Sequence, residues 1–126
     1  VSMSAYDEEW HMVGGHRLWH APEIAPRAYH PDNDPVQWQT DGDGVRITQP
    51  VERHNGIQKE LDIWLAPSTA HVRITHRLTN RGVWPVELAP WAISVMAPGG
   101  VGIIPLPKRG SHTENVLPTS TRALWA

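Results

Sequence analysis

The chain contains no cysteine, no phenylalanine, no long apolar run and no cluster of basic residues. The absence of cysteine excludes disulfide scaffolds, thiolate zinc sites and cysteine nucleophiles. No stretch approaches the roughly 20 apolar residues that a membrane span needs. The first ten residues carry Asp7, Glu8 and Glu9 instead of a basic start followed by an apolar stretch, which argues against a signal peptide. We therefore predict no membrane partner and a cytoplasmic location.

Charge excludes a further class of partner. The formal net charge of the 126 residues is −2, and the densest basic spot is the pair Lys108-Arg109. Binding to a phosphate backbone requires a basic patch, so nucleic acid is not a predicted partner. Seven tryptophans in a chain without phenylalanine mildly favour a carbohydrate partner, because tryptophan stacks on sugar rings, although it also fills β cores.

Twelve prolines and ten glycines leave little room for long helices, and a period of two recurs instead. Residues 56–65 and 71–80 alternate apolar and polar side chains and are joined by a short turn-like linker, which predicts an antiparallel hairpin. Placing Ile63 opposite Val72 matches apolar with apolar side chains and sets Asp62 against Arg73 on the outer face. This register places Lys59 opposite His76, with both on the otherwise apolar face.

Further strands are predicted at 16–20, 36–39, 45–51, 86–96 and 101–106, separated by turn signals such as the Asp41-Gly42-Asp43-Gly44 segment. Residues 21–35 carry four prolines and predict an ordered loop. Several short strands with turns between them are typical of an antiparallel β-sandwich or barrel. We predict an all-β chain that forms one β-sandwich domain over residues 1–126.

Five stretches carry a family resemblance when they are taken in order: 14–23 (GGHRLWHAPE), 29–33 (YHPDN), 56–60 (GIQKE), 76–82 (HRLTNRG) and 88–94 (LAPWAIS). Together they resemble a bacterial branch of the galactose-mutarotase-like (aldose 1-epimerase-like) superfamily over roughly residues 10–125. The resemblance implies a large antiparallel super-sandwich that binds carbohydrate on the concave face of its sheet.

The resemblance also implies what the chain lacks. Mutarotases use a histidine as general acid and a glutamate as general base, and the glutamate comes from the C-terminal half of the fold. The histidine would fall near residues 90–92, where none stands, and the chain ends on the apolar segment 121–126. The chain is therefore expected to be an N-terminal portion truncated within the fold. A second copy is expected to cover the open face, which gives a homodimer with Trp64 on the outer face of the hairpin.

Five residues are the candidate ligand contacts: His16, Arg17, Lys59, His76 and Trp91. Lysine and histidine on an apolar face are costly unless they bind a group or each other, although Lys59 could also extend to water at a rim. Arginine gives bidentate contacts to oxygen ligands. Trp91 is predicted to line the sugar cleft, with packing in the core as the alternative. His76 and His16 are the candidate acid–base residues.

No metal and no cofactor is predicted. His16, His20 and Glu23 could bind zinc, but glycines and a proline exclude the helix in which the His-x-x-x-His spacing is effective. The aspartates at 32, 34, 41 and 43 lie among proline, glycine and asparagine, which indicates turns instead of a calcium loop. An alternative role for Glu23 is a structural ion pair with Arg17.

Three functions follow. The first is a carbohydrate-binding domain of mutarotase-like fold without full catalytic machinery, for a sugar or sugar-derived ligand. The second is an aldose epimerase or mutarotase, in which His76 or His16 works with a carboxylate such as Glu23 or Glu60. The third is a structural oligomerising domain that has no ligand.

Overall fold

The computed structural model describes residues 14–106 and, beyond them, 108, 110, 111, 113, 114, 117, 121 and 123, together with the backbone of residues 2, 3, 8 and 9. The chain divides into two units, Val1–Met96 and Ala97–Ala126. Neither the described part of the first unit nor that of the second contains a helix. Accordingly, no helix in the described residues could cross a membrane.

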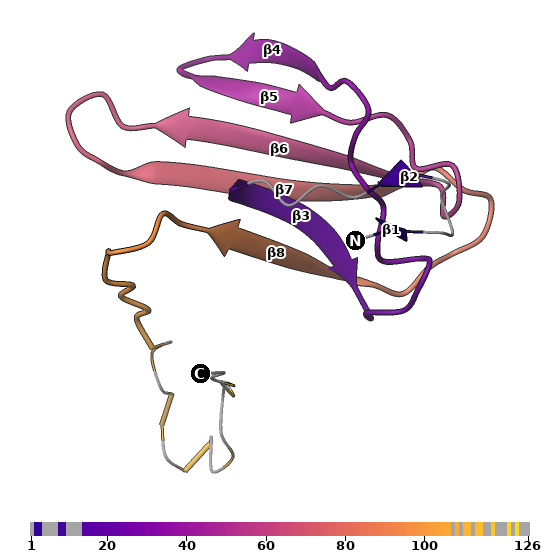
Figure 1. The fold of residues 1–126 in the computed structure, drawn as a ribbon. Helices are drawn as coiled ribbons and strands as arrows, with labels where there is room; N and C mark the ends of the chain where they lie inside the picture. The colour runs from indigo at the N-terminus through magenta and orange to yellow at the C-terminus, as the bar shows by residue number, and fades with distance from the viewer. Residues whose placement is uncertain are drawn as a thin grey trace. The chain divides into compact units, whose positions relative to one another are not determined.

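The first unit is an antiparallel β-sandwich, as the sequence predicts (Figure 1). A four-stranded sheet has the order β4-β5-β6-β7, and a ribbon of β3 and β8 packs against it. The short strands β1 and β2 form a separate pair. The bounds are β1 Ser2–Met3, β2 Glu8–Glu9, β3 Gly15–Ala21, β4 Gln37–Asp41, β5 Gly44–Thr48, β6 Ile57–Leu65, β7 Val72–Asn80 and β8 Ala89–Val95.

Local sequence explains the two hairpins of the larger sheet. The turn between β4 and β5 contains Gly42, whose φ of 59° is readily adopted only by glycine and a few polar residues. The longer loop between β6 and β7 is closed by Ala66, whose N–H donates to the carbonyl of His71 at 2.9 Å. Predicted strands at 16–20, 36–39, 45–51 and 86–96 are confirmed, with ends that differ by a few residues.

The predicted register of the β6–β7 hairpin is wrong by two residues. Ile63 lies opposite Ile74, and Leu65 lies opposite Val72. A shift of two keeps every side chain on its predicted face, so matching apolar with apolar residues does not detect it. The pairing of Ala66 with His71 sets the register. As a result, Lys59 lies opposite Leu78, and the predicted pair of Lys59 with His76 does not form.

The buried interior of the first unit contains charge as well as apolar side chains. The apolar core residues include Leu18 and Trp19, on the same strand as the buried His20. Trp19 packs against Tyr29 and Trp91, with ring centroids 5.5 Å away in both cases. The polar side chains of His20, Glu52 and Lys59 are at most 3% exposed. Buried charges must be paired, so these residues point to an organised polar cluster.

The second unit corrects one further prediction. Residues 101–106 are described, and they form no strand. Val101 and Ile103 are 90% and 88% exposed. An alternating apolar pattern forms a strand only where its backbone N–H and C=O groups find partners, and none pairs with this segment in the described part of the chain.

Candidate ligand-binding site

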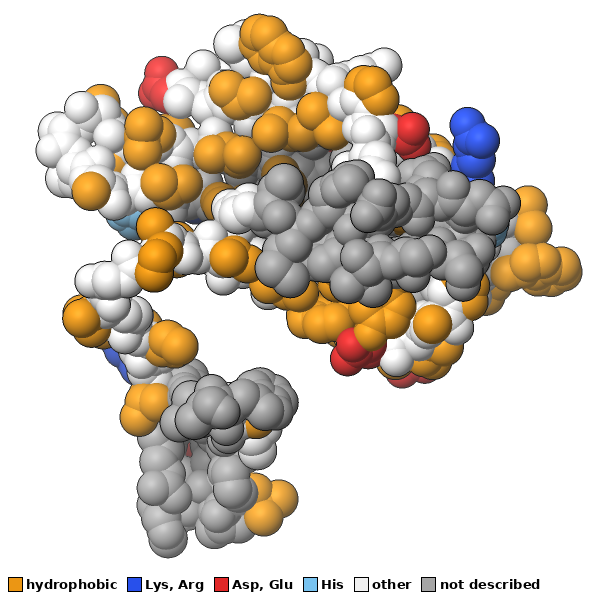
Figure 2. All heavy atoms as spheres, viewed as in Figure 1, with side chains coloured by type: hydrophobic (Ala, Val, Ile, Leu, Met, Phe, Trp, Pro, Cys, Tyr) orange, Lys and Arg blue, Asp and Glu red, His pale blue; other side chains and the backbone are white. Residues whose placement is uncertain are grey.

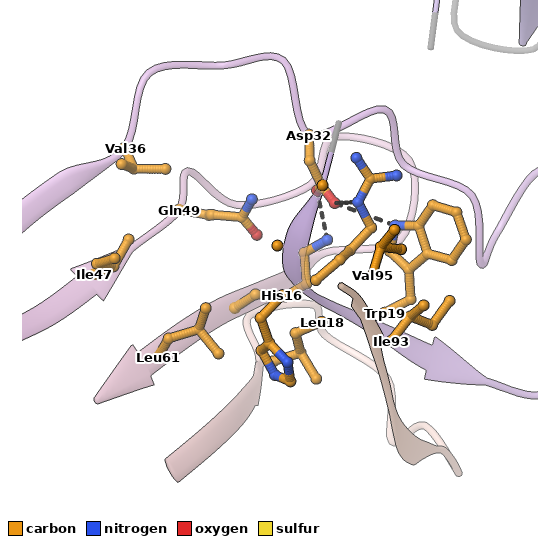
Figure 3. A pocket seen from close by; sticks show the side chains of 14 residues that line it. His16, Leu18, Trp19, Asp32, Val36, Ile47, Gln49, Leu61, Ile93 and Val95 are labelled. Atoms are coloured by element: carbon orange, nitrogen blue, oxygen red, sulfur yellow. Dashed lines mark hydrogen bonds and ion pairs between the residues drawn. The ribbon is translucent and has the colours of Figure 1, made fainter. Parts of the chain in front are cut away.

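A cavity of about 490 Å³ lies within the first unit, between the β3–β8 ribbon and strands β5 and β6 (Figure 3). Most of its wall is aliphatic, and one end is polar. The aliphatic wall consists of Leu18, Val36, Ile47, Leu61, Ile93 and Val95. The remaining lining residues are Gly14, Gly15, His16, Arg17, Trp19, Asp32, Gln49 and Lys59.

The carboxylate of Asp32 is the centre of the polar end. Lys59 Nζ donates to Asp32 Oδ1 at 2.5 Å, and Trp19 Nε1 donates to Oδ2 at 3.1 Å. Arg17 Nε lies 3.9 Å from the same Oδ2. Asp32 has a φ of 59°, a left-handed conformation that aspartate tolerates better than most residues. The loop therefore turns sharply at the point where its carboxylate enters the cavity.

The ammonium group of Lys59 is buried between two carboxylates. Its side chain is 2% exposed, and Nζ lies 2.5 Å from Asp32 and 2.8 Å from Glu52. The alternative in which Lys59 reaches water at a rim is therefore wrong. Burial alone would raise the pKa of Asp32, but its hydrogen bonds with His30 and Lys59 and the charge of Lys59 lower it below the ordinary value. Asp32 is thus an anion at neutral pH.

Glu52 is held in place by Asn55. The side-chain amide of Asn55 donates to Glu52 Oε2, and its Oδ1 accepts from the N–H of Ile57 at 2.8 Å. The same amide nitrogen lies 3.2 Å from His20 Nε2. Burial lowers the pKa of His20, so its ring is neutral at pH 7. The cluster therefore contains a fixed carboxylate behind Lys59 and an uncharged histidine.

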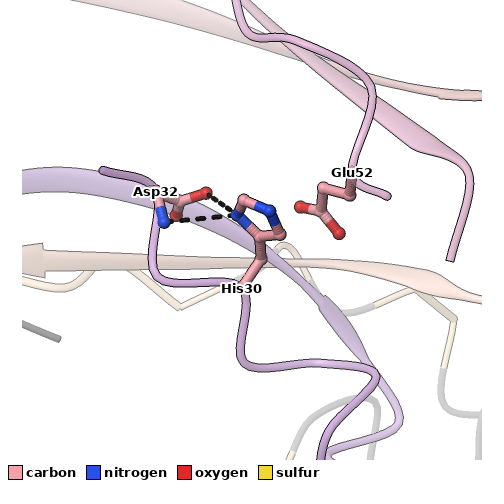
Figure 4. Close-up of side chains that lie close together, drawn as sticks. All are labelled: His30, Asp32 and Glu52. Atoms are coloured by element: carbon pink, nitrogen blue, oxygen red, sulfur yellow. Dashed lines mark hydrogen bonds and ion pairs between the residues drawn. The ribbon is translucent and has the colours of Figure 1, made fainter. Parts of the chain in front are cut away.

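His30, Asp32 and Glu52 are the described residues that could hold a metal ion, because ligand atoms from all three lie within 4.8 Å of one another (Figure 4). However, Lys59 Nζ contacts both carboxylates. His30 Nδ1 already contacts Asp32, whose backbone nitrogen lies 3.2 Å away and whose Oδ1 lies 3.4 Å away. The Lys59 ammonium occupies the position between the carboxylates that a bound cation would take. The arrangement suits an internal cation better than a metal.

A histidine pair joins the two sheets near the cavity. His16 Nε2 on β3 lies 2.6 Å from His76 Nε2 on β7, and Ser94 Oγ on β8 lies 2.7 Å from His16 Nδ1. The ring centroids are 5.0 Å apart, so the rings meet nearly end to end. One nitrogen must donate and the other accept, so the pair shares one proton. Burial and the neighbouring His16 lower the pKa of His76.

The predicted site residues fall into two groups. His16, Arg17 and Lys59 line the cavity. His76 contacts His16, and Trp91 packs on Trp19, but neither of these two lines the cavity.

The carboxylates suggested as acid–base partners lie elsewhere. Glu60 accepts from Thr48 Oγ1 at 3.3 Å, on the face of β6 opposite the one that carries Lys59. Glu23 accepts a hydrogen bond from the Tyr29 hydroxyl, while the ion-pair partner seen for Arg17 is Asp32. Neither glutamate is therefore positioned to work with the histidine pair.

Sequence reasoning missed Asp32, Glu52 and Gln49 as site residues. The sequence predicts a turn at Asp32, and Asp32 does adopt a turn conformation, but its carboxylate also enters the cavity. Glu52 and Gln49 follow strand β5, where the period-two pattern gives no signal for a ligand contact. The stretch 29–33 is one of the five that carry the family resemblance, and it contains Asp32, but neither it nor the group of aspartates at 32, 34, 41 and 43 predicts a ligand contact at Asp32.

No family model, curated protein or solved structure matches the chain. The fold and the site define an antiparallel β-sandwich with a cavity that is aliphatic over most of its wall and charged at one end.

Proposed function

We propose that this chain is a carbohydrate-binding domain of galactose-mutarotase-like type and that the cavity between its sheets is the ligand site. The observation that carries the proposal is the polar end, where Arg17 and Lys59 flank the Asp32 carboxylate inside a cavity of about 490 Å³. Sugar hydroxyls both donate and accept hydrogen bonds, so they suit a site that holds cationic donors and a carboxylate together. Concave, mostly apolar sites with a few fixed polar groups are typical of small-molecule binding.

Binding is favoured over epimerisation by the state of the available acid–base groups. The Asp32 carboxylate is engaged by Lys59 and Trp19, and its lowered pKa makes it a weak base. His16 borders the cavity, but both of its ring nitrogens are occupied by Ser94 and His76. An epimerase needs a free histidine and a carboxylate that converge on the substrate. Here the histidine is engaged by Ser94 and His76, and the carboxylate is engaged by Lys59 and Trp19.

Calorimetric titration with neutral aldoses, uronates and sugar phosphates tests the proposal. Arg17→Gln should weaken binding of the best ligand at least tenfold, because a charged donor at the polar end is lost. Arg53→Gln is the matched control, since Arg53 is exposed in a turn outside the cavity. Circular dichroism should show that both variants are folded. The absence of saturable heat for every sugar at millimolar concentration would overturn the proposal.

A second candidate function is self-association. Every residue of the edge strand β4 is exposed, and Trp38 on this strand is 70% exposed. Hydrophobic side chains gather over this edge of the first unit (Figure 2). Unprotected edge strands with apolar side chains pair with other chains. We expect a homodimer by light scattering at micromolar concentration, and we expect Trp38→Lys to convert it to monomer. A monomer in the unmodified chain would exclude this function.

A further inference from the structure

The cavity is more apolar than a bare sugar ring requires. Its volume of about 490 Å³ lies within the range of about 300–1,000 Å³ that is common for drug-sized ligands. Figure 3 shows Val36, Ile47 and Leu61 on one side, separated from the polar end around Asp32. A sugar bound at the polar end would leave this aliphatic side unfilled. An apolar group attached to the sugar would bury that surface.

The charges of the polar end balance within the cluster. Lys59 is paired with Asp32 and with Glu52, and Arg17 lies beside Asp32. Two cations thus face two anions. An anionic ligand could bind Lys59 only by displacing a carboxylate, which would leave a buried charge without its partner. The cluster therefore discriminates against uronates and sugar phosphates.

Gln49 marks the boundary between the two halves of the cavity. Its backbone is fixed, because its N–H donates to the carbonyl of Lys59 at 3.0 Å and its own carbonyl accepts from Gln58 Nε2 at 3.2 Å. Its side-chain amide lies between Ile47 and Asp32 in Figure 3. An uncharged amide offers two donors and an acceptor, which suits the hydroxyls of a neutral ligand.

Resting on the proposed function, we infer that the ligand is a neutral glycoside whose aglycone is an alkyl or aryl group. The sugar hydroxyls contact Arg17, Asp32, Lys59 and Gln49. The aglycone packs against Val36, Ile47 and Leu61 on the aliphatic side.

The test is a calorimetric titration of the full chain with methyl, butyl, hexyl and octyl glucosides and galactosides, each below the concentration at which it forms micelles. Burial of a methylene contributes a factor of about four in affinity, so affinity should rise by about this factor per methylene until the aliphatic side is filled. Ile47→Thr should flatten this dependence, because a hydroxyl replaces part of the wall. The matched control is Val72→Thr, since Val72 is 51% exposed and lies outside the cavity.

The other outcomes separate this inference from the proposed function. Equal affinities for methyl and octyl glycosides would overturn the inference and leave carbohydrate binding in place. Tighter binding of an alkyl uronide than of the matching neutral glycoside would overturn the neutral-ligand assignment alone. Equal affinities for octanol and octyl glycoside would overturn both, because the sugar would contribute nothing. Equal dependence on chain length in Ile47→Thr and in the unmodified chain would place the apolar group outside this cavity and overturn the inference.

Discussion

At the residue scale, the buried ammonium group of Lys59 is the centre of the polar cluster, because it lies between the carboxylates of Asp32 and Glu52. Alternation in residues 56–65 placed a lysine on an otherwise apolar face, which correctly marked it as a residue that needs a partner. The partner could not be predicted, because Asp32 lies 27 positions away in the chain, in a proline-rich loop without a period. The buried Lys59 ammonium holds that loop against β6 through Asp32 and contacts Glu52 as well.

Lys59→Met tests this role. Methionine fills a similar volume but leaves Asp32 and Glu52 buried without their cation, and breaking a buried ion pair in this way costs about 3–5 kcal/mol. We expect the free energy of unfolding, measured by urea titration at pH 7, to fall by about this amount. Lys108→Met is the control, because Lys108 is exposed, and it should change stability by less than about 0.5 kcal/mol. A similar small loss for both variants would show that the Lys59 pairs contribute nothing.

The outer face of the same sheet carries half-buried charges, and these also form ion pairs. Asp62 bonds Arg46 at 2.6 Å and Arg77 at 2.9 Å, and these hydrogen bonds lower its pKa to about 2. The sequence placed Asp62 on the outer face and predicted an arginine partner there, but it named Arg73. In the structure Arg73 lies over the ring of Trp64, at 5.0 Å from the centroid. Long side chains on an open face have several possible partners, so alternation predicts the face and not the pair.

At the scale of the strands, the sequence predicted which residues share a face better than it predicted how the strands align. The hairpin of β6 and β7 was placed correctly, with a register that was wrong by two residues. Both registers bury the same side chains, and the difference lies in how many residues the loop needs to close. Strand β5 is different, because its start at Gly44 is restricted by backbone contacts that no pattern of apolar residues reveals.

Gly44→Ala tests that restriction. A Cβ at this position would lie 2.6 Å from the carbonyl oxygen of Ile63 on the neighbouring strand β6. Relieving this clash requires a shift of the paired backbone, which costs free energy. We expect a loss of about 1–3 kcal/mol in the free energy of unfolding. Gly100→Ala should have little effect, because nothing lies within 4 Å of its added Cβ and its φ is not positive. An unchanged urea midpoint for Gly44→Ala would show that β5 and β6 can separate without cost.

At the scale of the whole first unit, composition and alternation predict the sandwich. The contacts between its two sheets could not be predicted from the sequence. The sequence predicts both His16 and His76 as site residues, but the predicted register places His76 opposite Lys59, where the structure has Leu78. Their actual contact joins β3 to β7 across 60 positions of the chain. Such contacts depend on how two sheets pack, and a single sequence contains no periodic signal for that packing.

The histidine pair makes the stability of this unit depend on pH. Burial and the nearby His16 lower the pKa of His76 below its ordinary 6.5, and burial lowers that of His20. Near and below pH 6.5, the unfolded chain therefore binds more protons than the folded chain. The free energy of unfolding consequently falls as pH drops below about 6.5. A second proton on the pair would also replace its hydrogen bond by repulsion between the two sheets.

We expect the urea midpoint to fall between pH 7.5 and pH 5.5 and expect this fall to be smaller in His76→Gln, which removes one of the two groups with a lowered pKa. His71→Gln is the control, because His71 is exposed at the β6–β7 loop, and it should keep the full dependence. Asp32 and Asp62 do not contribute in this pH interval, since their pKa values are lowered and their contributions are lost only as pH falls below about 4. The same pH dependence in His76→Gln and in the unmodified chain would mean that protonation of His76 does not contribute to the pH dependence of the free energy of unfolding. His20, buried on the same strand as His16, would then be the remaining described histidine with a lowered pKa that could account for it.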